Sequence, residues 1–132
     1  MENKIISLYK QALDLKPDDI RLINTLAKVY LENNDEEEAV KYFQKAIELN
    51  PVDGEAYNAF GLIYLDKKEY KKAYLHFRKA LDFDGHYYKN HYDIAKAYIG
   101  LNDYEKAKDS LKICLMLNPD FELAKILLDK LN

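Results

Sequence analysis

The chain has 132 residues, of which 48% are hydrophobic and 33% are charged, and this composition excludes an intrinsically disordered protein. Its 20 basic and 23 acidic residues give a formal net charge of -3, which excludes a strongly basic surface for nucleic acid or for an anionic membrane. The single cysteine, Cys114, excludes an internal disulfide and a multi-cysteine metal site.

The sequence shows no signal peptide at its start and no membrane-spanning segment. The start, MENKIISLYKQ, has no apolar core of signal-peptide length. No segment approaches the roughly 18 apolar residues that span a bilayer. We therefore expect a cytoplasmic protein that does not enter a membrane.

Residues 1–19 form the first predicted element, a single helix. Tyr9, Ala12 and Pro17 of this helix stand at the same spacing as Phe43, Ala46 and Pro51 further along the chain. The segment therefore corresponds to the second half of a longer repeated unit.

Three repeats of 34 residues follow, at 20–53, 54–87 and 88–121, and they align without gaps. Each carries a small residue, a Tyr three positions later, a central Ala, an aromatic residue or Leu, and a second small residue. In repeat order these are Ala27, Gly61 and Ala95; Tyr30, Tyr64 and Tyr98; Ala39, Ala73 and Ala107; Phe43, Phe77 and Leu111; and Ala46, Ala80 and Cys114.

Each repeat reads as two helices, because its apolar residues recur at three- and four-residue steps. The small residues predict close approach between the helices. Asp35 and Asp103 are expected to cap the second helices, and Glu38 suggests a capping box with Asp35. Gly85 stands where other repeats have Pro, and is expected to end its helix in a left-handed conformation.

Residues 122–132 form a predicted closing helix. Its LAKILLDKLN sequence is apolar on more than one face, although an end helix of a solenoid needs a polar outer side. At the opposite end, Ile6 and Leu13 are expected to be left exposed. Both ends therefore suggest a self-associating module as an alternative, and an adaptor fragment of a larger multidomain protein is another.

The repeat resembles the tetratricopeptide repeat family in its period and in its small, Tyr, Ala, aromatic and Pro positions. One departure is the absence of Trp, whose place is taken by Ile23, Tyr57 and His91. The resemblance implies an all-α, right-handed α-solenoid in one domain, 1–132. It also implies a non-enzymatic scaffold whose first helices line a concave groove that binds a peptide segment of a partner protein.

By the same resemblance, three positions of each first helix face the groove. They are Asn24, Lys28 and Leu31; Asn58, Leu62 and Leu65; and Tyr92, Lys96 and Ile99. The apolar members, expected to be surplus to the core, suit peptide side chains, and the asparagine amides suit a peptide backbone.

One subclass of the family clamps the terminal carboxylate of chaperone peptides. It would need Lys at 24, Asn at 28 and 59, Lys at 89 and Arg at 93. The chain has Asn24, Lys28, Ala59, Lys89 and Asp93, so only one of five agrees. Because Asp93 would repel a carboxylate, this subclass is rejected.

The densest cluster of rings is DGHYYKNHY, residues 84–92. His86 and His91 are five residues apart, which does not place them on one helix face, so we expect no metal site. Tyr87 and Tyr88 offer stacking surfaces, but the neighbouring acidic residues oppose nucleic acid. No phosphate-binding loop or nucleophile motif is present, so neither catalysis nor a cofactor is expected.

Overall fold

The computed structural model describes residues 3–132, which form two compact units. Unit 1 comprises residues 3–56, and unit 2 comprises Tyr57–Asn132. Each unit is described below by itself. That the whole chain is one domain stays a prediction, as does the part of the 1–19 helix at Met1 and Glu2, which lies outside the described residues.

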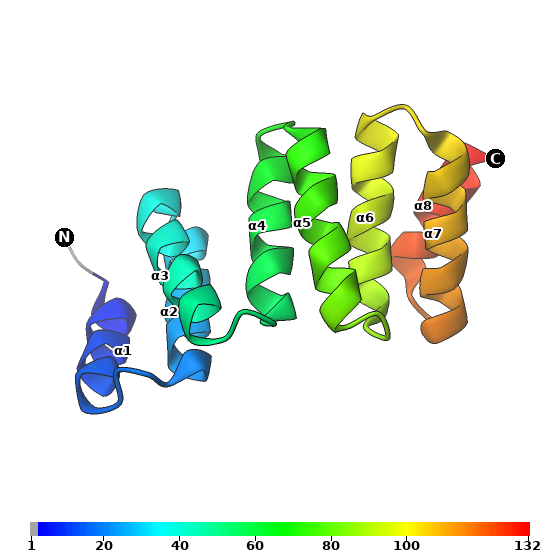
Figure 1. The fold of residues 1–132 in the computed structure, drawn as a ribbon. Helices are drawn as coiled ribbons and strands as arrows, with labels where there is room; N and C mark the ends of the chain where they lie inside the picture. The colour runs from blue at the N-terminus through cyan, green and yellow to red at the C-terminus, as the bar shows by residue number, and fades with distance from the viewer. Residues whose placement is uncertain (1–2) are drawn as a thin grey trace. The chain divides into compact units, whose positions relative to one another are not determined.

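The described residues form eight helices and no strands, which confirms the predicted all-α helical-repeat fold. They are α1 (Lys4–Leu15), α2 (Ile20–Glu32), α3 (Glu36–Leu49), α4 (Gly54–Asp66), α5 (Tyr70–Phe83), α6 (Tyr88–Gly100), α7 (Tyr104–Leu117) and α8 (Glu122–Leu131). In unit 1, α2 packs against α1 and α3. In unit 2, α5, α6, α7 and α8 pack in chain order (Figure 1).

Polar side chains cap several of these helices, as predicted for Asp35 and Asp103. Asp35 accepts from the Glu38 amide at 3.3 Å, and Asp103 accepts from the Lys106 amide at 3.2 Å. The predicted capping box also requires the Glu38 side chain to accept from the Asp35 amide, and this part of the prediction is wrong. The Asp35 amide donates to the Tyr30 carbonyl, and the Glu38 carboxylate pairs with Lys41.

The turn inside each repeat contains one residue in the left-handed conformation. These residues are Asn34 (φ 61°), Lys68 (φ 61°) and Asn102 (φ 63°), which recur at the 34-residue period. Gly85 does not adopt this conformation, since none of the described glycines has a positive φ, so that prediction is wrong. Helix α5 instead ends at Phe83, and the amide of its C-cap residue, Asp84, donates to the Ala80 carbonyl.

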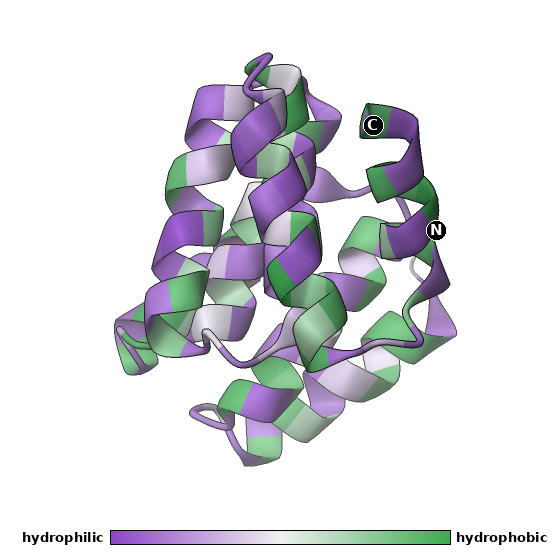
Figure 2. Ribbon diagram, turned by 90° about the vertical axis from the view of Figure 1, so that its right-hand side faces the viewer, coloured by the Kyte–Doolittle hydropathy of each residue, from purple (hydrophilic) through white to green (hydrophobic). Residues whose placement is uncertain are grey.

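Small residues bring paired helices close together. Ala27, Ala95 and the three central alanines are fully buried, as are the rings of Phe43 and Phe77. A Cβ built on Gly61 would lie 2.4 Å from the Phe77 ring, so this position tolerates no side chain without movement. Figure 2 shows hydrophobic and hydrophilic residues alternating around the helices, as an amphipathic pattern requires.

The two end helices differ from expectation in part. Ile6 and Leu13 are buried, at 5% and 8% exposure, so the prediction that they are left exposed is wrong. The exposed apolar residues of α1 are Ile5, Leu8 and Leu15 instead. On α8, Leu123 and Ile126 are exposed, whereas Leu127, Leu128 and Leu131 pack against the core around Leu111 and Cys114.

Among the described residues, no helix combines the length and the apolar character that crossing a bilayer requires.

Candidate binding surface

Six of the predicted groove positions belong to α4 and α6 of unit 2. We call this set the first-helix face of unit 2: Asn58, Leu62, Leu65, Tyr92, Lys96 and Ile99. The remaining three positions belong to α2 of unit 1. In unit 2, a hydrogen bond, an ion pair and ring contacts connect these side chains from α4 across α6 to the start of α8.

Asn58 provides the polar link between α4 and α6. Its Nδ2 donates to Asn90 Oδ1 at 2.9 Å and to Asp93 Oδ2 at 3.1 Å. Asn90 in turn donates to the Asp84 carbonyl at 3.0 Å, and it is 2% exposed. The Asn58 Nδ2 group therefore already donates to two residues of the chain. Of the Asn58 side chain, this leaves mainly the carbonyl oxygen for the predicted contact with a peptide backbone.

Asp93 is a buried carboxylate next to this amide. Burial raises the pKa of Asp93 above its usual value, while the hydrogen bond from Asn58 and the charges of Lys96 and Lys89 oppose the rise. Lys96 Nζ lies 3.8 Å from Asp93 Oδ1. The Asp93 carboxylate therefore forms an ion pair with Lys96, a member of the first-helix face of unit 2.

Tyr92 forms the centre of the face on α6. Its ring meets Phe121 edge-on, with centroids 5.0 Å apart, and Lys96 Nζ lies 4.6 Å from the ring centroid. Burial raises the pKa of the Tyr92 hydroxyl, with a smaller contribution from the Asp93 charge. The ring is thus fixed from one side and paired with a cation, an arrangement that presents a rigid, half-buried aromatic surface.

The apolar members of the face differ in exposure. Leu62 is 37% exposed, so it is available to a ligand. Leu65 packs against the core around Phe77 and Ile94, and Ile99 packs against the core around Leu111. The expectation that all of these side chains are surplus to the core is therefore wrong for Leu65 and Ile99.

On α2 of unit 1, the predicted groove positions are also partly used by the chain. Asn24 is 3% exposed and its Nδ2 donates to Asp53 Oδ2 at 2.9 Å. Its Oδ1 is buried without a partner among the described residues. Lys28 forms an ion pair with Glu55, and Leu31 is half-buried.

The sequence reasoning missed Phe121 and Asn90 as supports of the candidate surface. Phe121 also meets Tyr88 edge-on at 5.0 Å, so it holds two tyrosines of α6. A signal was present, since Phe121 lies one period after Tyr87 and two after Asp53. Which side chain it would touch depends on tertiary packing, which the register does not specify.

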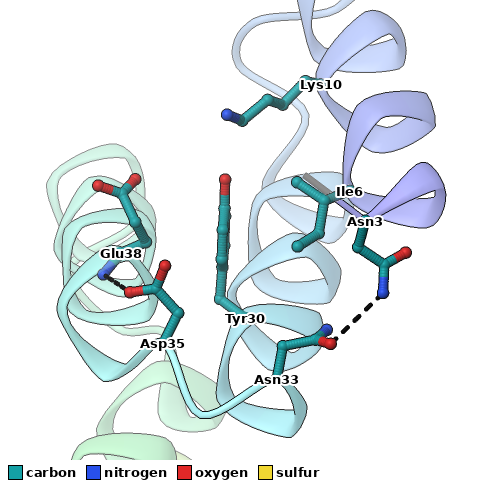
Figure 3. Close-up of a pocket in the computed structure, with 7 residues that line it drawn as sticks. All are labelled: Asn3, Ile6, Lys10, Tyr30, Asn33, Asp35 and Glu38. Atoms are coloured by element: carbon teal, nitrogen blue, oxygen red, sulfur yellow. Dashed lines mark hydrogen bonds between the residues drawn. The ribbon is translucent and has the colours of Figure 1, made fainter. Parts of the chain in front are cut away.

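A pocket of about 510 Å³ lies in unit 1 and is lined by residues of α1, α2 and α3 and of their ends. It is lined by Asn3, Ile6, Lys10, Tyr30, Asn33, Asp35 and Glu38 (Figure 3). Tyr30 stands between α1 and α3, and Lys10 Nζ lies 5.8 Å from the centroid of its ring. Asn3 donates to Asn33 at 3.4 Å across the lower edge, so polar groups surround the ring.

His91, one of the two histidines considered for a metal site, and His76 both have structural contacts. A ring nitrogen of His91 lies 2.7 Å from the Gly85 carbonyl, which joins α6 to the preceding turn. His76 packs among Tyr57, Phe60 and Tyr64 of α4. In the part of the chain that the structure covers, no three His, Cys, Asp or Glu side chains are arranged to hold a metal ion.

Comparison with known families identifies the repeat. The tetratricopeptide repeat model matches residues 3–60 and 64–131. The chain belongs to the tetratricopeptide repeat family. This confirms the resemblance of the three aligned segments. The comparison with curated proteins found no match.

Solved structures of other tetratricopeptide repeat proteins share the fold. The domain of Arabidopsis OM64 has a TM-score of 0.79 at 20% identity, over 86% of this chain and 93% of that one. YrrB, described as having an unusual peptide-binding site, has a TM-score of 0.82 at 24% identity, over 91% of this chain and 62% of that one.

A third similar structure is the first repeat domain of Spaghetti (RPAP3) bound to the HSP90 peptide SRMEEVD. Its TM-score is 0.79 at 20% identity, over 85% of this chain and 89% of that one. At such identities the likeness shows the fold alone. The chain therefore shares the helical-repeat fold of these proteins.

Proposed function

We propose that this tetratricopeptide repeat protein is a non-enzymatic scaffold that binds a peptide segment of a cytoplasmic partner protein. The segment binds to the first-helix face of unit 2. Within unit 1, Asn24, Lys28 and Leu31 of α2 are proposed as peptide contacts of their own. The observation that carries the proposal is the Tyr92 ring, which Phe121 fixes from one side and Lys96 covers with a cation.

The chemistry of this face favours an extended or helical segment with an apolar side chain. Leu62 supplies exposed apolar area, and Tyr92 supplies a rigid ring whose ordering costs little entropy on binding. Lys96 retains donor capacity beyond its 3.8 Å contact with Asp93, so it suits a peptide carbonyl or carboxylate. Two similar structures, YrrB and Spaghetti (RPAP3), are described with peptides or peptide-binding sites, which supports this class of ligand.

The ligand is not expected to be held by the chaperone-type carboxylate clamp. Asp93 stands where that clamp needs Arg, and Ala59 stands where it needs Asn. Asp93 is 8% exposed and is engaged by Asn58. A terminal carboxylate would therefore meet a buried negative charge instead of a donor.

The test compares two exposed leucine-sized side chains, one on the face and one away from it. Leu62→Glu adds charge to the face, whereas Met116→Glu changes an 80% exposed residue of α7. In pull-downs from the native cell extract, Leu62→Glu should lose the captured partner and Met116→Glu should keep it. Equal capture by both variants, with unchanged helicity in circular dichroism, would refute the first-helix face as the binding surface.

A second candidate function is self-association, which the exposed Leu123 and Ile126 of α8 favour. Size-exclusion chromatography with light scattering distinguishes it from partner binding. A dimer that Ile126→Glu converts into a monomer would support self-association. A monomer at all concentrations would refute self-association and leave partner binding as the remaining proposal.

A further inference from the structure

Unit 2 contains a second surface feature, an open pocket of about 480 Å³ formed by α5, α6 and α7. We call it the hairpin pocket of unit 2, and it is lined by Lys71, Tyr74, Leu75, Tyr98, Leu101, Asp103 and Lys106. Its volume is in the range typical of small-ligand and side-chain pockets, about 300–1,000 Å³. None of its lining residues belongs to the first-helix face of unit 2.

This pocket occupies the same place in the repeat as the pocket in unit 1. Six of its lining residues lie 68 residues, or two periods, after lining residues of that pocket. The pairs are Asn3 and Lys71, Ile6 and Tyr74, Tyr30 and Tyr98, Asn33 and Leu101, Asp35 and Asp103, and Glu38 and Lys106. The hairpin geometry therefore produces a pocket at this place, and the residues decide what it accepts.

The walls of the hairpin pocket of unit 2 are apolar. Tyr74 and Tyr98 have ring centroids 5.3 Å apart, and Leu75 and Leu101 are 57% and 40% exposed. Burial and a hydrogen bond with Tyr74 raise the pKa of Tyr98 to about 12, so the phenol stays neutral at working pH. An apolar side chain entering here would remove both leucines from water, which favours binding.

The rim of the pocket carries an unbalanced positive charge. Asp103 is engaged, because it caps α7 through the Lys106 amide and lies 3.6 Å from Lys106 Nζ. Lys71 has no ion pair among residues 3–132. In the unit 1 pocket, Asn3 stands in the place of Lys71 and Glu38 in the place of Lys106, so the excess charge of the lining residues there is negative. The unit 2 rim therefore complements a carboxylate.

We propose that the hairpin pocket of unit 2 is a second peptide-binding site, which takes one apolar side chain of a partner segment with a neighbouring acidic residue. The apolar side chain lies between Tyr74, Leu75 and Leu101, and the carboxylate lies near Lys71. This site is separate from the first-helix face of unit 2, so it stands or fails independently of the function proposed for that face.

The test is a titration of the ¹⁵N-labelled full chain with the capped peptide acetyl-Ser-Glu-Phe-Glu-Ser-amide, followed by backbone amide NMR shifts. The expected result is saturable shifts at Leu75, Leu101 and Asp103. Replacing Phe of the peptide by Ser should weaken binding at least about tenfold, because it removes the buried ring. Replacing both Glu residues by Lys should weaken it as well.

Variants that copy the unit 1 residues provide the matched controls. Leu101→Asn copies Asn33, which ends α2 with nearly the same backbone angles (φ -93°, ψ 12°) as Leu101 at the end of α6 (φ -87°, ψ 3°). This variant should fold normally and bind the peptide about tenfold more weakly. Lys71→Asn should lower the affinity for the peptide that carries Glu and should not lower the affinity for the peptide in which both Glu residues are replaced by Lys.

Four results would overturn the proposal. The first is unchanged affinity in Leu101→Asn, and the second is shifts that map to Leu62 and Lys96 instead of the pocket. The third is an absence of saturable shifts at millimolar peptide. Shifts at the pocket that depend on protein concentration without peptide would also overturn it, because a second copy of the chain would then be the occupant.

Discussion

The helix hairpin of unit 1 and the first hairpin of unit 2 place aligned residues in the same contacts with different chemistry. Ala27 and Gly61 are aligned, as are the fully buried rings of Phe43 and Phe77. Only glycine leaves room for the ring in unit 2, because a Cβ at position 61 would lie 2.4 Å from Phe77. The comparison shows that the 34-residue register fixes where helices meet. The residue at each position then decides how close they come.

The polar contacts of the two units make the same point. Asn24 donates to Asp53 in unit 1, and the aligned Asn58 donates to Asn90 and Asp93 in unit 2. One asparagine therefore satisfies a single partner and the other satisfies two. Substitutions at these aligned positions are therefore expected to have unequal effects in the two units.

The largest effect is expected at the buried ring of the middle repeat. Phe77→Ala should lower the free energy of unfolding by about 3–5 kcal/mol, because it leaves a cavity in the core. Urea denaturation followed by circular dichroism measures the loss. Gly61→Ala should be destabilising on its own, since its Cβ would lie 2.4 Å from the ring.

The two changes should be coupled. In the Phe77→Ala background Gly61→Ala should become neutral or stabilising, because the ring is gone and alanine favours the helix over glycine by about 1 kcal/mol. Additive effects would show that Gly61 is not required by Phe77. Ala27→Gly serves as the aligned control in unit 1. It should lower the free energy of unfolding only by the difference in helix propensity between alanine and glycine, about 1 kcal/mol.

The second prediction separates the two asparagines. Asn58→Ala should cost about 1–3 kcal/mol, because it removes the amide donor of the buried Asp93 carboxylate and of Asn90. Asn24→Ala should cost less, because Asp53 keeps its bond from the Ala56 amide at 3.2 Å. Thermal and urea denaturation of both variants test the order, and a larger loss at Asn24 would contradict it.

The third prediction concerns the left-handed turn residues. Lys68 adopts φ 61°, where Asn34 and Asn102 stand in the other repeats. Lys68→Gly should stabilise the protein by about 1 kcal/mol, since a residue with a Cβ is strained in this region and glycine is not. Asn34→Gly is the matched control and should gain less, because asparagine tolerates the conformation. Equal gains in both turns would count against this explanation.

The smallest effect is a pH dependence that arises from Asp93. Its pKa in the folded protein is raised above 3.8 by burial, so the folded state holds this proton more tightly than the unfolded state does. Stability contributed by this group is therefore present below pH 3.8 and is lost as pH rises through the raised pKa. Asn58, Lys96 and Lys89 oppose the rise, which keeps the effect small.

Asp93→Asn should remove that slope. Urea denaturation between pH 3 and pH 7 should show a smaller loss of stability with rising pH in the variant than in the wild type. Since asparagine keeps an oxygen that accepts from Asn58, packing should be preserved. A variant with the wild-type slope would assign the dependence to other groups.

The repeat, the family, the helices and the positions of the small residues between them could be predicted from the sequence alone. Alignment at a fixed period shows these features because each depends on local spacing along one helix. It also located the caps Asp35 and Asp103, since a cap bonds to an amide only three residues away.

Which contact each of the aligned residues makes became known only from the packing of the helices. That Phe121 supports Tyr92, that Asn58 is occupied by Asn90 and Asp93, and that Ile6 and Leu13 are buried all depend on side chains from different helices. The two hairpin pockets also required it, because their walls come from three helices. Periodicity specifies the face that a residue occupies, whereas the distance to a partner depends on how the helices pack.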